Sequence, residues 1–174
     1  MKFAIISFAA VLLSASSAFP CTGIMGTPQS WVKEAEAILR ARALEEQRPW
    51  TVQQWLWDLA PSTRHYEQFD TKVTFKVLEV LKGTPPATVM AFEGMLTDGD
   101  NPNDRSVPYD WVRSAGRTGR CFAYSYKKGG EYLLLLHTRK GELTPYWATM
   151  AATNEQLFGR DDKWLAWVRE HLKV

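Results

Sequence analysis

The sequence predicts a mainly β protein, a small barrel or sandwich of short strands with flanking helices. Three observations predict this class. Short strand-like segments recur between turns, most clearly the alternating pattern over residues 71–81 and the continuous apolar run over 132–137. The clearest amphipathic helix comes last, over 161–172. Strands and helices do not alternate regularly along the chain, which argues against a doubly wound α/β sheet.

The N-terminus has the pattern of a secretory signal peptide. Residues 1–18 start with one lysine, continue as an apolar run and end in small residues, and Ser16 and Ala18 fit cleavage after Ala18. The run is shorter than the roughly 20 apolar residues that a spanning helix needs. We therefore expect a mature chain of residues 19–174 that is secreted or periplasmic, forms a single domain and does not insert into a membrane.

The charge limits the classes of binding partner to expect, and the cysteine content indicates a disulfide. The formal net charge is +2 and falls to about +1 once the lysine of the leader is removed. A nearly neutral chain has no electrostatic basis for binding nucleic acid or anionic membranes. Two cysteines in an exported chain most simply indicate one disulfide. We expect a monomer.

The first mature elements are a short helix and a strand. Ser30 can cap a helix, and the alanine, leucine, glutamate and arginine content after it favours one. Further on, Leu39 and Ala41 alternate with arginines, which is typical of a strand with a polar outer face. We expect a helix over residues 30–35 and a strand over 37–45.

A hairpin follows a long excursion. Residues 48–70 contain one helical turn at most, over 53–59. Residues 71–81 are the clearest strand, although the apolar positions change parity near its end, which predicts a β-bulge or a barrel corner. A turn over 82–86 leads to a second strand over 87–93.

The loop Leu96–Asp104 is rich in acidic and amide side chains, which could bind a hard cation. It lacks EF-hand spacing, because the twelfth position counted from Asp98 is Tyr109 rather than glutamate. A solvated surface loop is the better interpretation. Beyond it, we expect strands over 132–137 and 143–148 and a final helix capped by Asp161 or Asp162.

The order of these blocks resembles the netrin-like domain, an OB-type barrel best known as the N-terminal half of the tissue inhibitors of metalloproteinases. The resemblance covers residues 21–155, and later blocks such as DDKWLAWVR also resemble uncharacterised exported bacterial proteins of this pattern. Six blocks carry the resemblance, in this order: Cys21, AEAILRARA (35–43), TKVTFKVLEVLKG (71–83), Cys121, EYLL (131–134) and Tyr146-Trp147.

This resemblance implies a small closed OB-like barrel and a Cys21–Cys121 disulfide, because the inhibitors pair the corresponding cysteines. Their inhibition uses the first cysteine and the residues after it, so the implied partner-binding residues here are Cys21, Thr22 and Gly23. The inhibitors carry a second cysteine where this chain has Gly23. Cleavage after Ala18 also leaves two residues before Cys21, so that it has no free amine to chelate zinc.

No catalytic constellation is recognisable, so we expect neither an enzyme nor a cofactor or metal. The three histidines, His65, His137 and His171, have no metal-binding spacing, and no Gly-rich phosphate loop or nucleophile elbow occurs. The expected function is therefore the binding of an extracellular or envelope protein through the tethered N-terminal segment. In form this would be inhibitor-like, and a protease is one candidate partner.

A second hypothesis rests on tryptophan. Trp50, Trp55 and Trp57 cluster in the excursion between the first two strands. Aromatic side chains of this kind stack on sugars or anchor interfaces, but they also cover cores. This cluster is the basis of the alternative prediction that the protein binds carbohydrate or cell-wall polymer.

Overall fold

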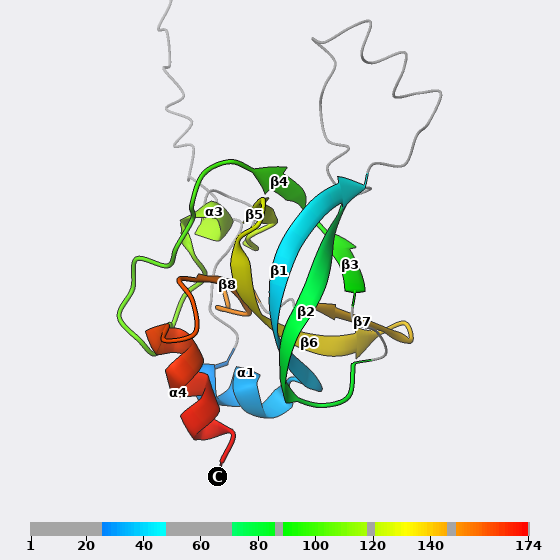
Figure 1. The fold of residues 1–174 in the computed structure, drawn as a ribbon. Helices are drawn as coiled ribbons and strands as arrows, with labels where there is room; N and C mark the ends of the chain where they lie inside the picture. Colours follow the sequence, from blue (N-terminus) through cyan, green and yellow to red (C-terminus); the bar gives the residue numbers. More distant parts are fainter. Residues whose placement is uncertain (1–25, 48–70, 86–88, 118–120, 146–148, 174) are drawn as a thin grey trace, which may run out of the picture.

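The computed structural model of the chain describes residues 26–47, 71–85, 89–117, 121–145 and 149–173. Strands dominate this part, which confirms the predicted mainly β class. Figure 1 shows the elements, which are α1 (Pro28–Glu34), β1 (Ala37–Gln47), β2 (Lys72–Lys82), β3 (Val89–Glu93), β4 (Met95–Thr97), α3 (Ser114–Arg117), β5 (Ser125–Lys127), β6 (Glu131–Arg139), β7 (Glu142–Pro145), β8 (Asn154–Leu157) and α4 (Lys163–His171).

One antiparallel sheet organises the fold. Its order is β3-β2-β1-β6-β7, and β8 also pairs with β6, whereas β4 and β5 form a separate parallel pair. Within the described residues these strands do not close into a barrel. The predicted hairpin between the strands over 71–81 and 87–93 is confirmed as β2 and β3.

The β1–β2 pairing contains the predicted bulge. The register advances from Ala41↔Val77 to Arg40↔Glu79, so that Leu78 is an extra residue on β2. Further shifts occur between Ile38 and Leu39 and between Ala43 and Glu45. An extra residue changes which side chains face inward, and this explains the change of parity in the sequence.

The central strand β1 separates two apolar cores. On one side its alternate residues pack with aromatic side chains, including Phe75, Tyr126 and Tyr132. On the other side Ile38 packs with Leu133 and Leu135 of β6 beneath both long helices. The core residues of the helices are Trp31 and Val32 of α1 and Trp164, Leu165 and Val168 of α4.

Both predicted helices are confirmed, but α1 starts earlier than predicted: Thr27 is its N-cap and Ser30 lies in its first turn, whereas Asp162 caps α4 as predicted. Thr27 and Ser30 form a capping box at the start of α1, and Asp162 accepts hydrogen bonds from the backbone N–H groups of Trp164 and Leu165 at the start of α4. The Lys82 ammonium donates to two carbonyls in the last turn of α1. A Cβ at Gly83 would lie 2.2 Å from the carbonyl oxygen of Glu36, so this turn requires glycine.

Some predictions differ from the structure. The strand predicted over 143–148 is β7, which spans Glu142–Pro145, and the loop predicted to begin at Leu96 starts as strand β4. The short elements β5, β8 and α3 were not predicted. The helical turn over 53–59 lies outside the described residues. None of the described helices is long and apolar enough to span a bilayer.

Candidate partner-binding surface

Most predicted site residues lie outside the described part of the chain. This holds for Cys21, Thr22 and Gly23 and for the tryptophan cluster of residues 50–57, so binding through them stays a prediction. Cys121 is described and is not a free thiol. Cys121 is half-buried and has a positive φ, and its carbonyl accepts a hydrogen bond from the backbone N–H of Met150. The pairing with Cys21 also stays a prediction.

Two carboxylates of the acidic loop pair with other side chains of the same chain. Asp100 accepts hydrogen bonds from the ammonium of Lys127 and the amide of Gln156, and these contacts lower the pKa of its carboxyl. Asp104 pairs with Arg117. No group of three His, Cys, Asp or Glu side chains among the described residues is placed to hold a metal ion. The loop is therefore exposed, as predicted, but Asp100 and Asp104 also attach it to Lys127, Gln156 and Arg117.

Two histidines are described, and each has a partner within the fold. His137 Nδ1 lies 3.9 Å from a carboxylate oxygen of Glu36. The His171 ring stacks on Trp167 with a centroid distance of 3.8 Å, and its Nδ1 lies 2.9 Å from the Trp167 carbonyl oxygen. Neither arrangement places a histidine beside a nucleophile. His65 lies outside the described residues.

The long segment after β4 is fastened by a buried polar cluster that we call the β8 hub, which consists of Arg113, Asn154, Glu155 and Gln156. Arg113 is 0% exposed, and its guanidinium donates to the carbonyls of Ala123, Ser125 and Asn154. The guanidinium carbon also lies 5.2 and 5.3 Å from the ring centroids of Tyr126 and Tyr132. Such a cation between aromatic faces combines charge, hydrogen bonding and packing.

The carboxylate of the hub is equally enclosed. Glu155 is 0% exposed and accepts hydrogen bonds from the Arg113 backbone N–H and the Asn103 side-chain amide. Burial raises the pKa of the Glu155 carboxyl to about 7, while the Arg113 charge and the Asn103 hydrogen bond act in the opposite direction. A perturbed carboxyl can indicate a functional site. Here no solute can reach it, and its contacts fasten the loop to the sheet.

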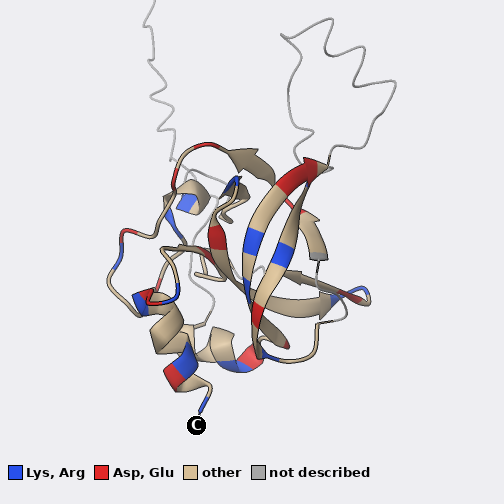
Figure 2. Cartoon of the chain, in the orientation of Figure 1, with Lys and Arg blue, Asp and Glu red and all other residues tan. Residues whose placement is uncertain are grey.

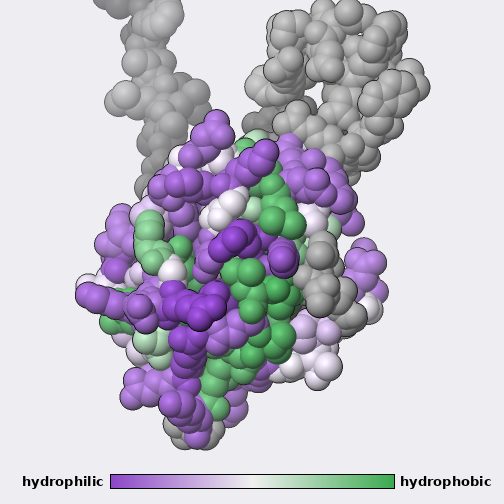
Figure 3. Space-filling view, viewed as in Figure 1, coloured by the Kyte–Doolittle hydropathy of each residue, from purple (hydrophilic) through white to green (hydrophobic). Residues whose placement is uncertain are grey.

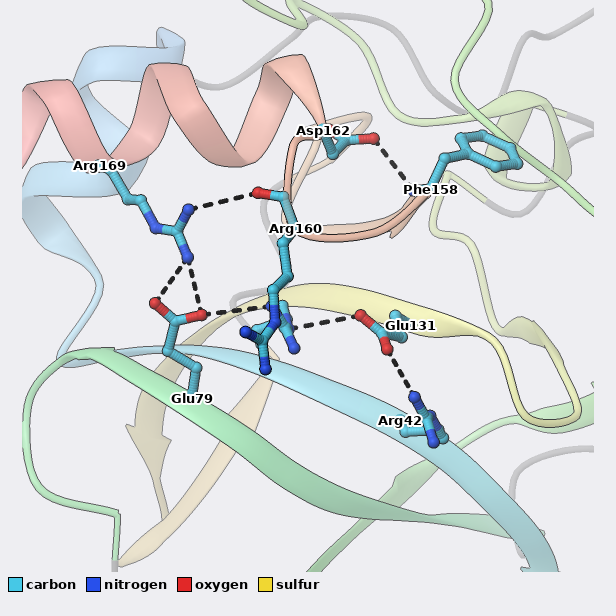
Figure 4. Close-up of polar contacts among 8 residues, drawn as sticks. Arg42, Glu79, Glu131, Phe158, Arg160, Asp162 and Arg169 are labelled. Atoms are coloured by element: carbon cyan, nitrogen blue, oxygen red, sulfur yellow. Dashed lines mark hydrogen bonds and ion pairs between the residues drawn. The ribbon is translucent and has the colours of Figure 1, made fainter.

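An exposed polar cluster lies on the outer side of the sheet, and we call it the arginine face. It consists of Arg40 and Arg42 of β1, Glu79 of β2, Glu131 of β6, Arg169 of α4 and Arg160 of the loop before α4. Figure 4 shows the two glutamates held among the arginines. Arg169 Nη2 lies 2.7 and 2.8 Å from the two oxygens of Glu79, and Arg42 Nη2 lies 2.7 Å from Glu131.

Arg40 lies at the centre of the arginine face. It is 6% exposed, and its guanidinium lies 3.5 Å from Glu79 and 3.4 Å from Glu131. Its Nε and one Glu131 oxygen are buried without a hydrogen bond. The strand period explains its position: Ile38, Arg40 and Arg42 point to the same side of β1, where Ile38 and Arg40 are buried and Arg42 is exposed.

One exposed apolar side chain belongs to the loop that also carries Arg160. Phe158 is 65% exposed, the highest value among the large apolar residues described, whereas the next, Val80, pairs in register with Leu39 and so faces the other side of the sheet. The backbone N–H of Phe158 donates to the Asp162 carboxylate, which fixes the loop that presents the ring. Figure 4 shows Phe158 on the loop beyond Asp162, with its ring pointing away from the arginines. In Figure 3, hydrophobic surface lies directly beside hydrophilic side chains on this face.

Sequence reasoning identified only part of this surface. The strand pattern predicted that Arg40 and Arg42 form the polar outer face of a strand, and Arg42 is exposed there, whereas Arg40 shares that side of the strand but is buried. It did not indicate that Arg160 and Arg169 reach the same place from the other end of the chain, because that contact depends on how α4 packs. No protein-family model matches the chain, and no curated protein matches its sequence.

Proposed function

We propose that this chain is an exported domain that binds another protein, and that the arginine face with the nearby Phe158 is a contact surface. The observation that carries this proposal is the exposed Phe158 ring on the loop that also supplies Arg160 to the cluster of four arginines. Arginine and aromatic side chains are the residue types enriched in protein interfaces and in their energetic hot spots. A ring that is 65% exposed contributes little to the core, so packing does not explain it.

The finer proposal is a netrin-like domain with a closed OB-type barrel, a Cys21–Cys121 disulfide and a second contact through Cys21, Thr22 and Gly23. Strand bulges such as that at Leu78 support it, because barrels use them to turn corners. The intact mass of the exported protein tests the processing and the disulfide together. A start at Phe19 with two hydrogens fewer than the reduced chain is expected; a start at Cys21 or two free thiols would contradict it.

A capture experiment tests the proposed function. The mature protein, immobilised, is exposed to the extracellular and envelope fractions of its native source, in parallel with Phe158→Ser and Lys128→Ser. Lys128 is exposed at the turn before β6 and serves as the matched control. We expect one protein retained by the wild type and by Lys128→Ser, and at least tenfold less of it retained by Phe158→Ser. Equal retention by all three proteins, or none, would contradict the proposal.

The same fractions test the N-terminal contact. Cys21→Ser removes the proposed tether without changing the arginine face. Loss of the captured protein in this variant, with folding intact by circular dichroism, would support a contact through the segment. Retention equal to the wild type would restrict binding to the arginine face.

A further inference from the structure

We propose that the arginine face binds an acidic segment of the partner protein, with partner carboxylates on Arg42 and Arg160 and an apolar partner side chain against Phe158. This inference rests on the proposed function and names the chemistry of the partner. Three features of the surface support it: the use of its donors and acceptors, its charge balance and the nearby Phe158 ring.

The donors and acceptors of the face are unequally used. The Glu79 carboxylate accepts two short hydrogen bonds from Arg169 and forms a longer ion pair with Arg40. The Glu131 carboxylate forms ion pairs with Arg42 and Arg40. Each arginine has five N–H groups, but Arg42 has one described hydrogen bond, to Glu131. Arg160 contributes its backbone carbonyl to Arg169, and Figure 4 shows its side chain directed toward the cluster. The face therefore offers N–H donors, while its carboxylates are already engaged.

The charge of the arginine face also favours an acidic partner. The arginine face holds four arginines and two glutamates, an excess of two positive charges, and Asp162 beside Phe158 lowers this excess to one at that end. Lys76 of β2 is exposed and pairs in register with Arg42, so a basic band crosses both strands, and the acidic end of β1 follows it (Figure 2). Excess positive charge steers acidic partners and excludes basic ones. Arginine also binds carboxylates through two parallel hydrogen bonds, which fixes their orientation.

The internal ion pairs preorganise the arginines for this task. Arg40 is enclosed and contacts both glutamates, so that it fixes the carboxylates that in turn position Arg42 and Arg169. A partner then meets guanidinium groups whose side-chain entropy is already reduced. The exposed ring of Phe158 supplies an apolar contact that a purely ionic polymer could not use. This favours an acidic protein segment over a phosphate or sulfate polyanion.

Peptide binding tests the inference directly. A fluorescent peptide of glutamates around one leucine, EEELEEE, is titrated with the mature protein, and QQQLQQQ is the neutral counterpart. We expect the glutamate peptide to bind at least tenfold more tightly, and its affinity to fall at least threefold between 50 and 300 mM NaCl. Equal binding of the two peptides, or no binding of the acidic one, would overturn the inference.

Variants assign the binding to the face. Arg42→Glu with Arg160→Glu should weaken the acidic peptide at least tenfold, Arg42→Lys with Arg160→Lys should weaken it less, and Arg139→Glu, on the exposed end of β6, should have no effect. Thermal unfolding of each variant confirms folding. Tight binding of inorganic polyphosphate without the peptide would also overturn the inference. If the peptide fails but Phe158→Ser still abolishes partner capture, the proposed function stands and only the acidic chemistry is wrong.

Discussion

The β8 hub and the arginine face both contain arginine and glutamate, but in different surroundings. In the hub the Arg113 guanidinium bonds backbone carbonyls and its backbone N–H bonds Glu155, whereas on the face the guanidinium groups bond the carboxylates. In the hub, Arg113 and Glu155 are 0% exposed, and their hydrogen bonds join them to buried groups of the protein such as the Ser125 carbonyl. On the arginine face, the side chains of Arg42 and Glu79 are 47% and 34% exposed, so water can reach them. The hub fixes the structure, whereas the face presents charge.

This difference shows how burial changes the role of the same residue types. A buried charged group costs desolvation, so it persists only when its hydrogen-bond partners are in place, and removing one member is strongly destabilising. An exposed pair contributes little to stability because water and salt compete for it. The hub should therefore determine the free energy of unfolding, and the face should determine binding.

The largest effect is expected for Arg113→Met. The variant removes three hydrogen bonds to backbone carbonyls and leaves the Glu155 carboxyl without its cationic neighbour. Loss of one buried partner typically costs about 3–5 kcal/mol in the free energy of unfolding. Urea denaturation measures it, with the exposed Arg139→Met as control. A loss below about 1 kcal/mol would mean that the hub is not a stability determinant.

The hub should also make stability depend on pH. The pKa of Glu155 is raised from 4.5 to about 7 in the folded protein, so the folded state holds the proton more tightly than the unfolded state. The stabilisation linked to this group is complete below about pH 4.5 and is lost as the pH rises through about 7. The Glu155→Gln variant lacks this titration.

Urea denaturation of the wild type and Glu155→Gln between pH 5 and pH 8 tests this linkage. As the pH rises, the free energy of unfolding of the wild type should fall relative to that of the variant. Because both proteins share every other titrating group, their difference isolates Glu155. A constant difference across the range would contradict the linkage.

A smaller loss is expected for Arg40→Met. Arg40 is buried, but Glu79 and Glu131 are partly exposed and keep Arg169 and Arg42 as partners. We expect a loss of about 1 kcal/mol in the free energy of unfolding. The same variant should weaken binding of the acidic peptide, since the two glutamates lose the residue that positions both. A loss as large as that of Arg113→Met would remove the distinction between the two regions.

The smallest effect on stability is expected for Phe158→Ser. Its ring is 65% exposed, so the free energy of unfolding should change by less than about 0.5 kcal/mol. Thermal and urea unfolding of the variant check this value. A clear destabilisation would show that the ring packs within the domain, and the loss of partner capture could then not be assigned to the surface.

The sequence by itself determined the local elements with a strong periodic or capping signal. The alternation in residues 71–81 predicted β2, its change of parity predicted the bulge, and the apolar face of 161–172 predicted α4. These patterns are readable because a strand or helix imposes its own period on the residues that it buries. Strand β8 was missed because Asn154, Glu155 and Gln156 are buried polar residues without an apolar alternation.

Tertiary structure alone decided where distant charges meet. Arg40 and Arg42 were predictable as an outer strand face, but Glu79, Glu131 and Arg169 join them only through strand register and the packing of α4. The sequence contains two similar sets of arginines and glutamates and does not distinguish them. Burial does: the sheet and the loop enclose Arg113 with Glu155, while Arg42 is exposed. That difference in solvent access separates the residues that hold the fold from those that can meet a partner.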